Sequence, residues 1–131
     1  MKKNEIGPIV SKRQFDKIME YIETGKKEGA KLVLGGDNPK DPELKNGFFI
    51  NPTIFTDVNP SMTIAKEEIF GPVISVLTWE SYEELIEIAN STLYGLTAMI
   101  ATNSLSNAMK TAEDIQAGYV WINTFGRYSG A

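Results

Sequence analysis

Apolar residues near the start of the chain follow a helical repeat. The repeating residues are Phe15, Ile18, Met19 and Ile22. Ser11 and Gln14 have the spacing of a capping box, in which each side chain can reach the other's free backbone N–H. The pattern predicts a helix from about Lys12 to Glu28 that ends at Gly29, with Gly25 lowering the helix propensity inside it.

The apolar segments that follow are short and rich in β-forming residues. Residues 32–34 predict a short buried strand, and residues 37–47 predict an exposed polar loop. Two further β-rich pieces, 48–50 and 53–56, are separated by Pro52. Because proline has no N–H to donate to a strand ladder, Pro52 indicates a bulge, an edge or the start of a strand.

The second half of the chain alternates strand and helix patterns. Strands are predicted over residues 73–79, 96–101 and 119–122. Ser81 with Glu84 predicts the start of one helix, and Asn103 or Ser104 predicts the start of the next. We expect this last helix to end at Gly118. Its expected inner face consists of Leu105, Ala108, Met109, Ala112 and Ile115.

This order of elements predicts the fold class. Strands that alternate with helices over short connections favour parallel strands joined by right-handed crossovers. The expected class is α/β, with a small, mostly parallel sheet flanked by helices. The chain has 131 residues, of which 42% are hydrophobic and 23% charged, so we expect one globular domain over residues 1–131.

Charge and hydropathy exclude several classes of function. The net charge is −4 and no dense Lys/Arg stripe is present, so nucleic acid is not an expected partner. No apolar run is long enough to span a bilayer, and no signal-peptide core follows the first residues. We therefore expect no membrane partner and a cytoplasmic location.

The chain contains no cysteine and no histidine. The first absence excludes disulfides, thiolate catalysis and a cysteine-type zinc site within this sequence. The second removes the commonest general base and metal ligand. Asp41, Glu43 and Asp57 lack the spacing of a calcium or magnesium loop, so no metal site is predicted.

The segment 66–73, Lys-Glu-Glu-Ile-Phe-Gly-Pro-Val, is the most informative part of the chain. It sets the carboxylate of Glu68 and the ring of Phe70 close together, then turns at Gly-Pro, then begins an apolar strand. Ligands of α/β proteins bind at strand ends of this kind. The segment is therefore a candidate ligand-binding site.

Residues 67–73 also resemble the conserved E-x-F-G-P segment of the aldehyde dehydrogenase superfamily. Five further pieces resemble the family in the same order along the chain. They are residues 7–10, 21–32, 51–55, 94–96 and 117–123. The resemblance covers nearly the whole chain, and it implies part of the catalytic domain of an NAD(P)-dependent enzyme that oxidises a small aldehyde to a carboxylic acid.

The resemblance also implies roles for individual residues. Glu68 matches the family glutamate that hydrogen-bonds the ribose on the nicotinamide side of the cofactor, and Phe70 matches the aromatic residue near the nicotinamide ring. Gln14 and Lys17 lie on the helix that the family uses near the other ribose. Phe125 and Tyr128 fall in the loop that helps to wall the aldehyde tunnel, although residues 126–129 are not typical of the family.

Each of these residues also has a simpler interpretation. Glu68 can be a solvated or capping carboxylate, and Phe70 can be a core aromatic residue before a turn. Gln14 can be the capping partner of Ser11 with no further role. Lys17 can be a solvated lysine on a helix face. Tyr128 can belong to an unstructured end of the chain.

Three parts of the family's active site have no counterpart in this sequence. They are the Gly-rich pyrophosphate turn, the nucleophilic cysteine and the general-base glutamate. We therefore expect an interior-to-late piece of the enzyme, truncated at both ends, inactive alone and binding NAD or NADP weakly or not at all. Its expected partners are further copies or the missing remainder of the enzyme. The alternatives are a non-catalytic structural remnant that self-associates or docks on a full-length relative, and a stand-alone nucleotide-binding module.

Overall fold

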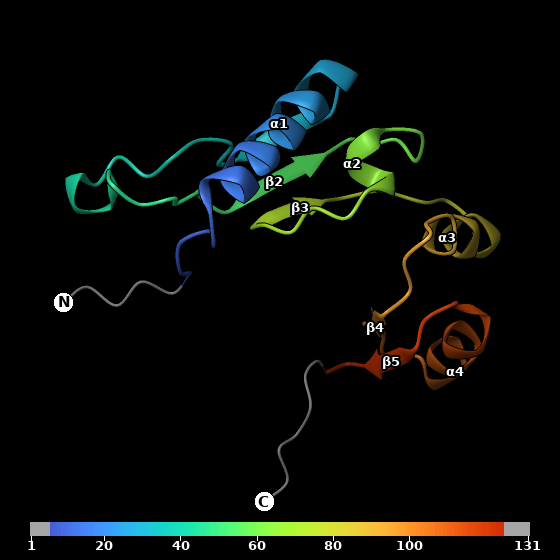
Figure 1. Cartoon of the computed structure of the whole chain (residues 1–131). Helices are drawn as coiled ribbons and strands as arrows, with labels where there is room; N and C mark the ends of the chain where they lie inside the picture. The colour runs from blue at the N-terminus through green and yellow to red at the C-terminus, as the bar shows by residue number, and fades with distance from the viewer. Residues whose placement is uncertain (1–5, 125–131) are drawn as a thin grey trace, which may run out of the picture. The chain divides into compact units, whose positions relative to one another are not determined.

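The computed structural model describes residues 6–124, and these residues form two compact units with the division after Thr78. The order of elements is α/β, as the sequence predicts (Figure 1). Two of the three strand pairs, β2 with β3 and β4 with β5, are parallel. Each unit is described by itself below.

The first unit begins with helix α1, Lys12–Glu28, whose predicted bounds are confirmed. The Ser11 hydroxyl accepts a hydrogen bond from the Gln14 backbone N–H at 3.2 Å, which caps the first turn. Gly29 ends the helix in the left-handed conformation, with φ of 98°. Ile18 and Ile22 are fully buried on the inner face of α1.

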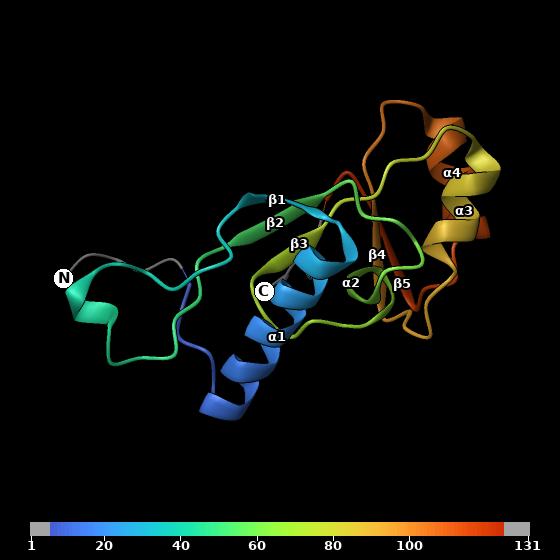
Figure 2. The same cartoon turned by 90° about the horizontal axis from the view of Figure 1, so that it is seen from above.

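A three-stranded sheet lies against α1, with β2 in the centre (Figure 2). Its strands are β1 (Lys31–Leu34), β2 (Thr53–Thr56) and β3 (Val73–Ser75). β1 and β2 are antiparallel, whereas β2 and β3 are parallel. β2 starts directly after Pro52, which agrees with one of the three interpretations of that proline.

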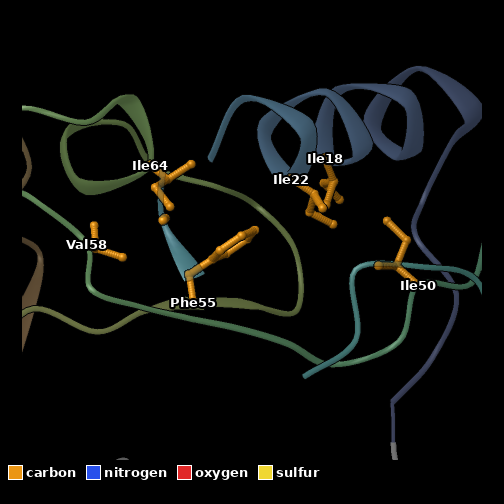
Figure 3. Packing of buried hydrophobic residues seen from close by; sticks show 7 residues of the cluster. Ile18, Ile22, Ile50, Phe55, Val58 and Ile64 are labelled. Atoms are coloured by element: carbon orange, nitrogen blue, oxygen red, sulfur yellow. The ribbon is translucent and has the colours of Figure 1, made fainter. Parts of the chain in front are cut away.

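The core of the first unit fills the space between α1, the sheet and the short helix α2 (Thr63–Lys66). Figure 3 shows Ile18 and Ile22 projecting from α1 above Phe55 of β2, with Ile64 of α2 beside that ring. Phe55 is fully buried. Burial of side chains of this size contributes about 1.5–3 kcal/mol each, which fixes α1 and α2 on this face of the sheet.

Three predictions for the first unit need correction or refinement. β1 is not buried, because Val33 and Leu34 are 49% and 52% exposed at the edge of the sheet. β3 is shorter than the predicted 73–79. The polar loop contains a 3₁₀ turn, η1 (Pro42–Leu44), capped by the Asp41 carboxylate, which accepts from the Glu43 N–H at 3.0 Å.

The second unit contains α3 (Tyr82–Ala89), β4 (Thr97–Ile100), α4 (Leu105–Asp114) and β5 (Tyr119–Ile122). β4 and β5 form a parallel pair, as predicted. Ser81 and Ser104 cap α3 and α4 by accepting from the backbone N–H groups of Glu84 and Asn107. The sequence therefore located both helix starts.

Three predictions that concern the second unit need correction. β3 and β4 belong to different sheets, so the described strands form two sheets instead of the one small sheet that we expected. α4 ends at Asp114 rather than Gly118, and its buried residues are Ala108 and Thr111. Leu105 and Met109, predicted to face inward, are 77% and 50% exposed.

Candidate functional site

The turn between α2 and β3 displays the two residues that the sequence analysis placed in a cofactor site. α2 ends at Lys66, and the cap residue Glu67 that follows it has an extended backbone conformation. Two short backbone hydrogen bonds then shape the turn: Gly71 N–H donates to the Ile69 carbonyl and Val73 N–H to the Gly71 carbonyl, both at 2.8 Å. Glu68 is exposed, and the Phe70 side chain is 72% exposed.

This exposure excludes one interpretation of Phe70. A ring that is 72% exposed is not a core aromatic residue. An exposed ring of this size on a rigid turn is available to a ligand, because apolar surface is more stable when it is covered. The exposed carboxylate of Glu68 lies two residues away on the same turn.

A side chain of helix α1 is hydrogen-bonded to a backbone carbonyl of this turn. The Gln14 side-chain Nε2 donates a hydrogen bond to the Phe70 backbone carbonyl at 3.1 Å. Gln14 is therefore more than the capping partner of Ser11. A methyl group at Gly71 would lie 2.6 Å from Cδ1 of Ile18, so the absence of a side chain there lets the turn approach α1 closely.

Tyr21 is a residue that the sequence analysis did not assign to the site. Its hydroxyl donates to Oε2 of Glu67 at 2.5 Å. The ammonium group of Lys17 lies 5.5 Å from the centre of the Tyr21 ring, within cation–π range. Tyr21 follows Gln14 by seven residues, or two helical turns, so the helical repeat was the available signal that the two share a face.

Lys17 also lines a small hollow on the side of α1. The hollow has a volume of about 210 Å³ and is bordered by Lys17, Glu20, Tyr21, Thr24 and Thr63. Thr63 is held there by Glu28, whose two carboxylate oxygens accept from the Thr63 N–H at 2.8 Å and hydroxyl at 2.6 Å. The hollow therefore combines a cation, a carboxylate and hydroxyl groups.

The structure thus brings Gln14 and Phe70 into contact, and it links Lys17 through Tyr21 to Glu67, the neighbour of Glu68. Phe125 and Tyr128, assigned to the aldehyde tunnel, lie outside the described residues. Within residues 6–124, no three carboxylate, imidazole or thiol groups cluster closely enough to hold a metal ion. No helix among these residues is long and apolar enough to cross a bilayer.

The second unit contains a separate hollow of about 690 Å³ beside α3, β4 and α4. Trp79, Tyr82 and Met99 contribute apolar surface to it, and Lys110 contributes a cation. None of the predicted site residues lines this hollow. The cofactor-site candidates that the structure describes are therefore confined to the first unit.

Comparison with known proteins identifies the family. The family model described as "Aldehyde dehydrogenase family" matches residues 1–130. The chain belongs to the aldehyde dehydrogenase family. It is 51% identical over 126 residues to retinaldehyde dehydrogenase 3 of Rattus norvegicus, an alignment that covers 96% of this chain and 24% of that protein.

Solved aldehyde dehydrogenases share the fold. The chain resembles the NAD+ complex of aldehyde dehydrogenase from Bacillus cereus, with a TM-score of 0.89 and 46% identity over 97% of this chain and 25% of that chain. The chain also resembles betaine aldehyde dehydrogenase from Staphylococcus aureus in complex with NAD+, with a TM-score of 0.93 and 38% identity. This match covers 98% of this chain and 25% of that chain. The chain therefore spans about a quarter of the length of these relatives.

Proposed function

We propose that the chain supplies one wall of the dinucleotide cleft of an NAD(P)-dependent aldehyde dehydrogenase. In that enzyme the cofactor accepts a hydride from the aldehyde carbon as the acid is formed. The observation that carries the proposal is the contact between Gln14 and the Phe70 carbonyl. It gathers residues 56 positions apart at one exposed surface that carries Glu68 and the Phe70 ring.

The roles follow from the chemistry of each side chain. The carboxylate of Glu68 is an acceptor for ribose hydroxyl groups, and hydrogen bonds to a charged group are among the stronger ones in proteins. The ring of Phe70 offers a flat apolar surface to the nicotinamide. Gln14 and Lys17 offer donors to the other ribose, and Phe125 and Tyr128 are proposed for the aldehyde tunnel.

The chemical step needs groups that this sequence lacks. The family reaction proceeds through a cysteine thiolate, and the chain has no cysteine. We therefore propose that the nucleophile, the general base and the pyrophosphate cradle come from other sequence. The chain alone is expected to produce no NADH from aldehydes, and steady production by a pure sample would contradict this assignment.

The test of the cofactor wall is a titration of the nitrogen-15-labelled chain with NAD and, separately, NADP. We expect weak, saturable shifts of the amide signals of Gln14, Lys17 and residues 67–71. Glu68→Gln should weaken binding about tenfold, since a hydrogen bond to a charged group contributes about 1.5–3 kcal/mol. Glu80→Gln, a change at another exposed glutamate, should leave the affinity unchanged. Absence of shifts up to the solubility limit of both cofactors would overturn the proposal.

An alternative function, a non-catalytic remnant that associates with other chains, is favoured by one observation. Leu34, Ile54 and Ile74 are register partners across β1, β2 and β3. Leu34 is 52% exposed and Ile74 57% exposed, so an aliphatic row lies open on the sheet. Open apolar rows on sheets favour association with another surface.

A further inference from the structure

The two adjacent glutamates of the family motif have different environments in this structure. Both are exposed, but the Glu67 carboxylate accepts a hydrogen bond from the Tyr21 hydroxyl at 2.5 Å, and Glu68 lies beside it on the turn that displays Phe70. We propose that Tyr21 and Glu67 are positioning residues, which together with Gln14 fasten both ends of residues 67–70 to α1. This inference rests on the proposed cofactor wall, since it explains how Glu68 is held in place.

The spacing of the two contacts supports a clamp. Gln14 and Tyr21 are seven residues apart on α1, which corresponds to about 10.5 Å along a helix. Glu67 and Phe70 are three residues apart, which corresponds to about 10 Å in an extended chain. The two lengths match, so the segment runs along α1 in the opposite direction, with Glu67 at Tyr21 and Phe70 at Gln14.

Glu68 lies between these two fixed points. Its neighbour Glu67 is held through its side chain, and Phe70 is held through its backbone carbonyl. The backbone at residue 68 is therefore restrained on both sides while its carboxylate stays exposed. A preorganised acceptor binds a ligand with less loss of conformational entropy than a mobile one.

Lys17 extends the same arrangement. Its ammonium group lies over the Tyr21 ring, and the Tyr21 hydroxyl reaches Glu67. The ring of Tyr21 thus stands between a cation on α1 and a carboxylate on the turn.

The inference is tested on the full chain by hydrogen exchange of individual amides, first without cofactor. Tyr21→Phe and Glu67→Ala should each speed exchange at Gly71, whose N–H donates to the Ile69 carbonyl, about two- to tenfold, the range expected for one lost hydrogen bond. The double variant should be no faster than either single one, because both remove the same contact. Glu67→Gln should stay near the parent value, since its amide oxygen still accepts from Tyr21.

Two controls separate positioning from general loss of structure. Lys12→Met removes the exposed ion pair with Asp16 on another face of α1 and should leave exchange at Gly71 unchanged. The thermal midpoint should fall by no more than about 10 °C in any variant, the shift expected for one lost hydrogen bond. Unchanged exchange in Glu67→Ala, or equal acceleration over α1 and the sheet, would overturn the inference.

Cofactor titration of the same variants completes the test. Tyr21→Phe and Glu67→Ala should weaken NAD binding about two- to tenfold, and Glu67→Gln should restore it. If the parent chain shows no cofactor-induced shifts, the proposed function fails while the exchange result still decides the clamp. Faster exchange at Gly71 with unchanged NAD affinity would contradict the positioning role.

Discussion

At the scale of single residues, glycines show how contacts that are distant in sequence constrain a position. Gly29 and Gly35 both have positive φ, 98° and 68°. A Cβ atom at Gly29 would meet nothing within 4 Å, whereas one at Gly35 would lie 2.1 Å from the backbone oxygen of Pro52. Gly29 is needed for its left-handed backbone conformation alone. Gly35 is needed for its left-handed conformation and because the Pro52 backbone leaves no room for a side chain.

This difference predicts unequal effects of the same substitution. Gly29→Ala should lower the free energy of unfolding of the first unit by about 1–2 kcal/mol, the cost of the left-handed conformation. Gly35→Ala should cost more, because the clashing atom belongs to the backbone and cannot rotate away. Urea denaturation followed by circular dichroism measures both. Equal losses of unfolding free energy in the two variants would show that the nearby Pro52 backbone adds no cost at position 35.

At the scale of elements, α3 and α4 are joined by a polar cluster on the second unit. The Tyr82 hydroxyl and the Lys110 ammonium both donate to Oδ2 of Asp114, each at 2.7 Å. The Lys110 nitrogen also lies 3.8 Å from the centre of the Tyr82 ring. The hydrogen bond from Lys110, with a further one from Tyr82, holds the pKa of Asp114 below its ordinary value, and the hydrogen bond to Asp114 raises the pKa of Lys110.

The directions of these two pKa shifts determine how the stability contributed by the cluster depends on pH. Because the folded state binds the Asp114 proton less readily than the unfolded state, the contribution of Asp114 is present above its ordinary pKa of 3.8 and is lost as pH falls. Lys110 has the opposite sign, so its contribution is present below its ordinary pKa of 10.5 and is lost as pH rises through the folded-state value. Between these limits the cluster is fully formed.

We predict that Asp114→Asn removes the pH dependence of stability that comes from Asp114 and from Lys110. The urea midpoint of the parent chain should fall more steeply than that of the variant below about pH 4 and above about pH 10.5. Both tryptophans, Trp79 and Trp121, lie in the second unit, so their fluorescence reports its unfolding. Asp16→Asn, in an exposed ion pair of the first unit, is the control. Parallel curves for parent and Asp114→Asn would contradict the prediction.

At the scale of the whole molecule, each unit has a sheet with exposed apolar side chains. In the first unit the row is Leu34, Ile54 and Ile74. In the second unit Met99 and Tyr119 are 56% and 52% exposed on the parallel pair of strands. Helix α1 covers the face of the first sheet that carries Phe55 (Figure 3), whereas Leu34 and Ile74 of the opposite row are more than half exposed.

This open row predicts self-association of the isolated chain. Sedimentation should show species heavier than 14.5 kDa whose population rises with concentration. Ile74→Lys should shift the distribution towards monomer, because a buried lysine opposes pairing of apolar faces. Leu93→Lys, at a fully exposed position outside the strands, should not. A parent chain that stays monomeric at high concentration would remove the self-association alternative.

The local elements were determined by the sequence itself. The helix starts at Ser11, Ser81 and Ser104 and the end of α1 at Gly29 depend on side chains within four residues, so a capping rule identifies them. The parallel pairing of β4 and β5 likewise follows from the strand–helix–strand order. The family motif over residues 67–73 also drew attention to the turn on which Glu68 and Phe70 are exposed.

Tertiary structure alone decided the division into two sheets, the exposure of β1 and of Leu105, and the contacts of α1 with residues 67–70. Periodicity shows which side chains share a face, but not whether another element covers that face. The pairs Gln14–Phe70 and Tyr21–Glu67 join positions 56 and 46 residues apart. Such contacts depend on the packing of Ile18, Ile22 and Phe55, which holds the helix on the sheet, and no local sequence rule contains that information.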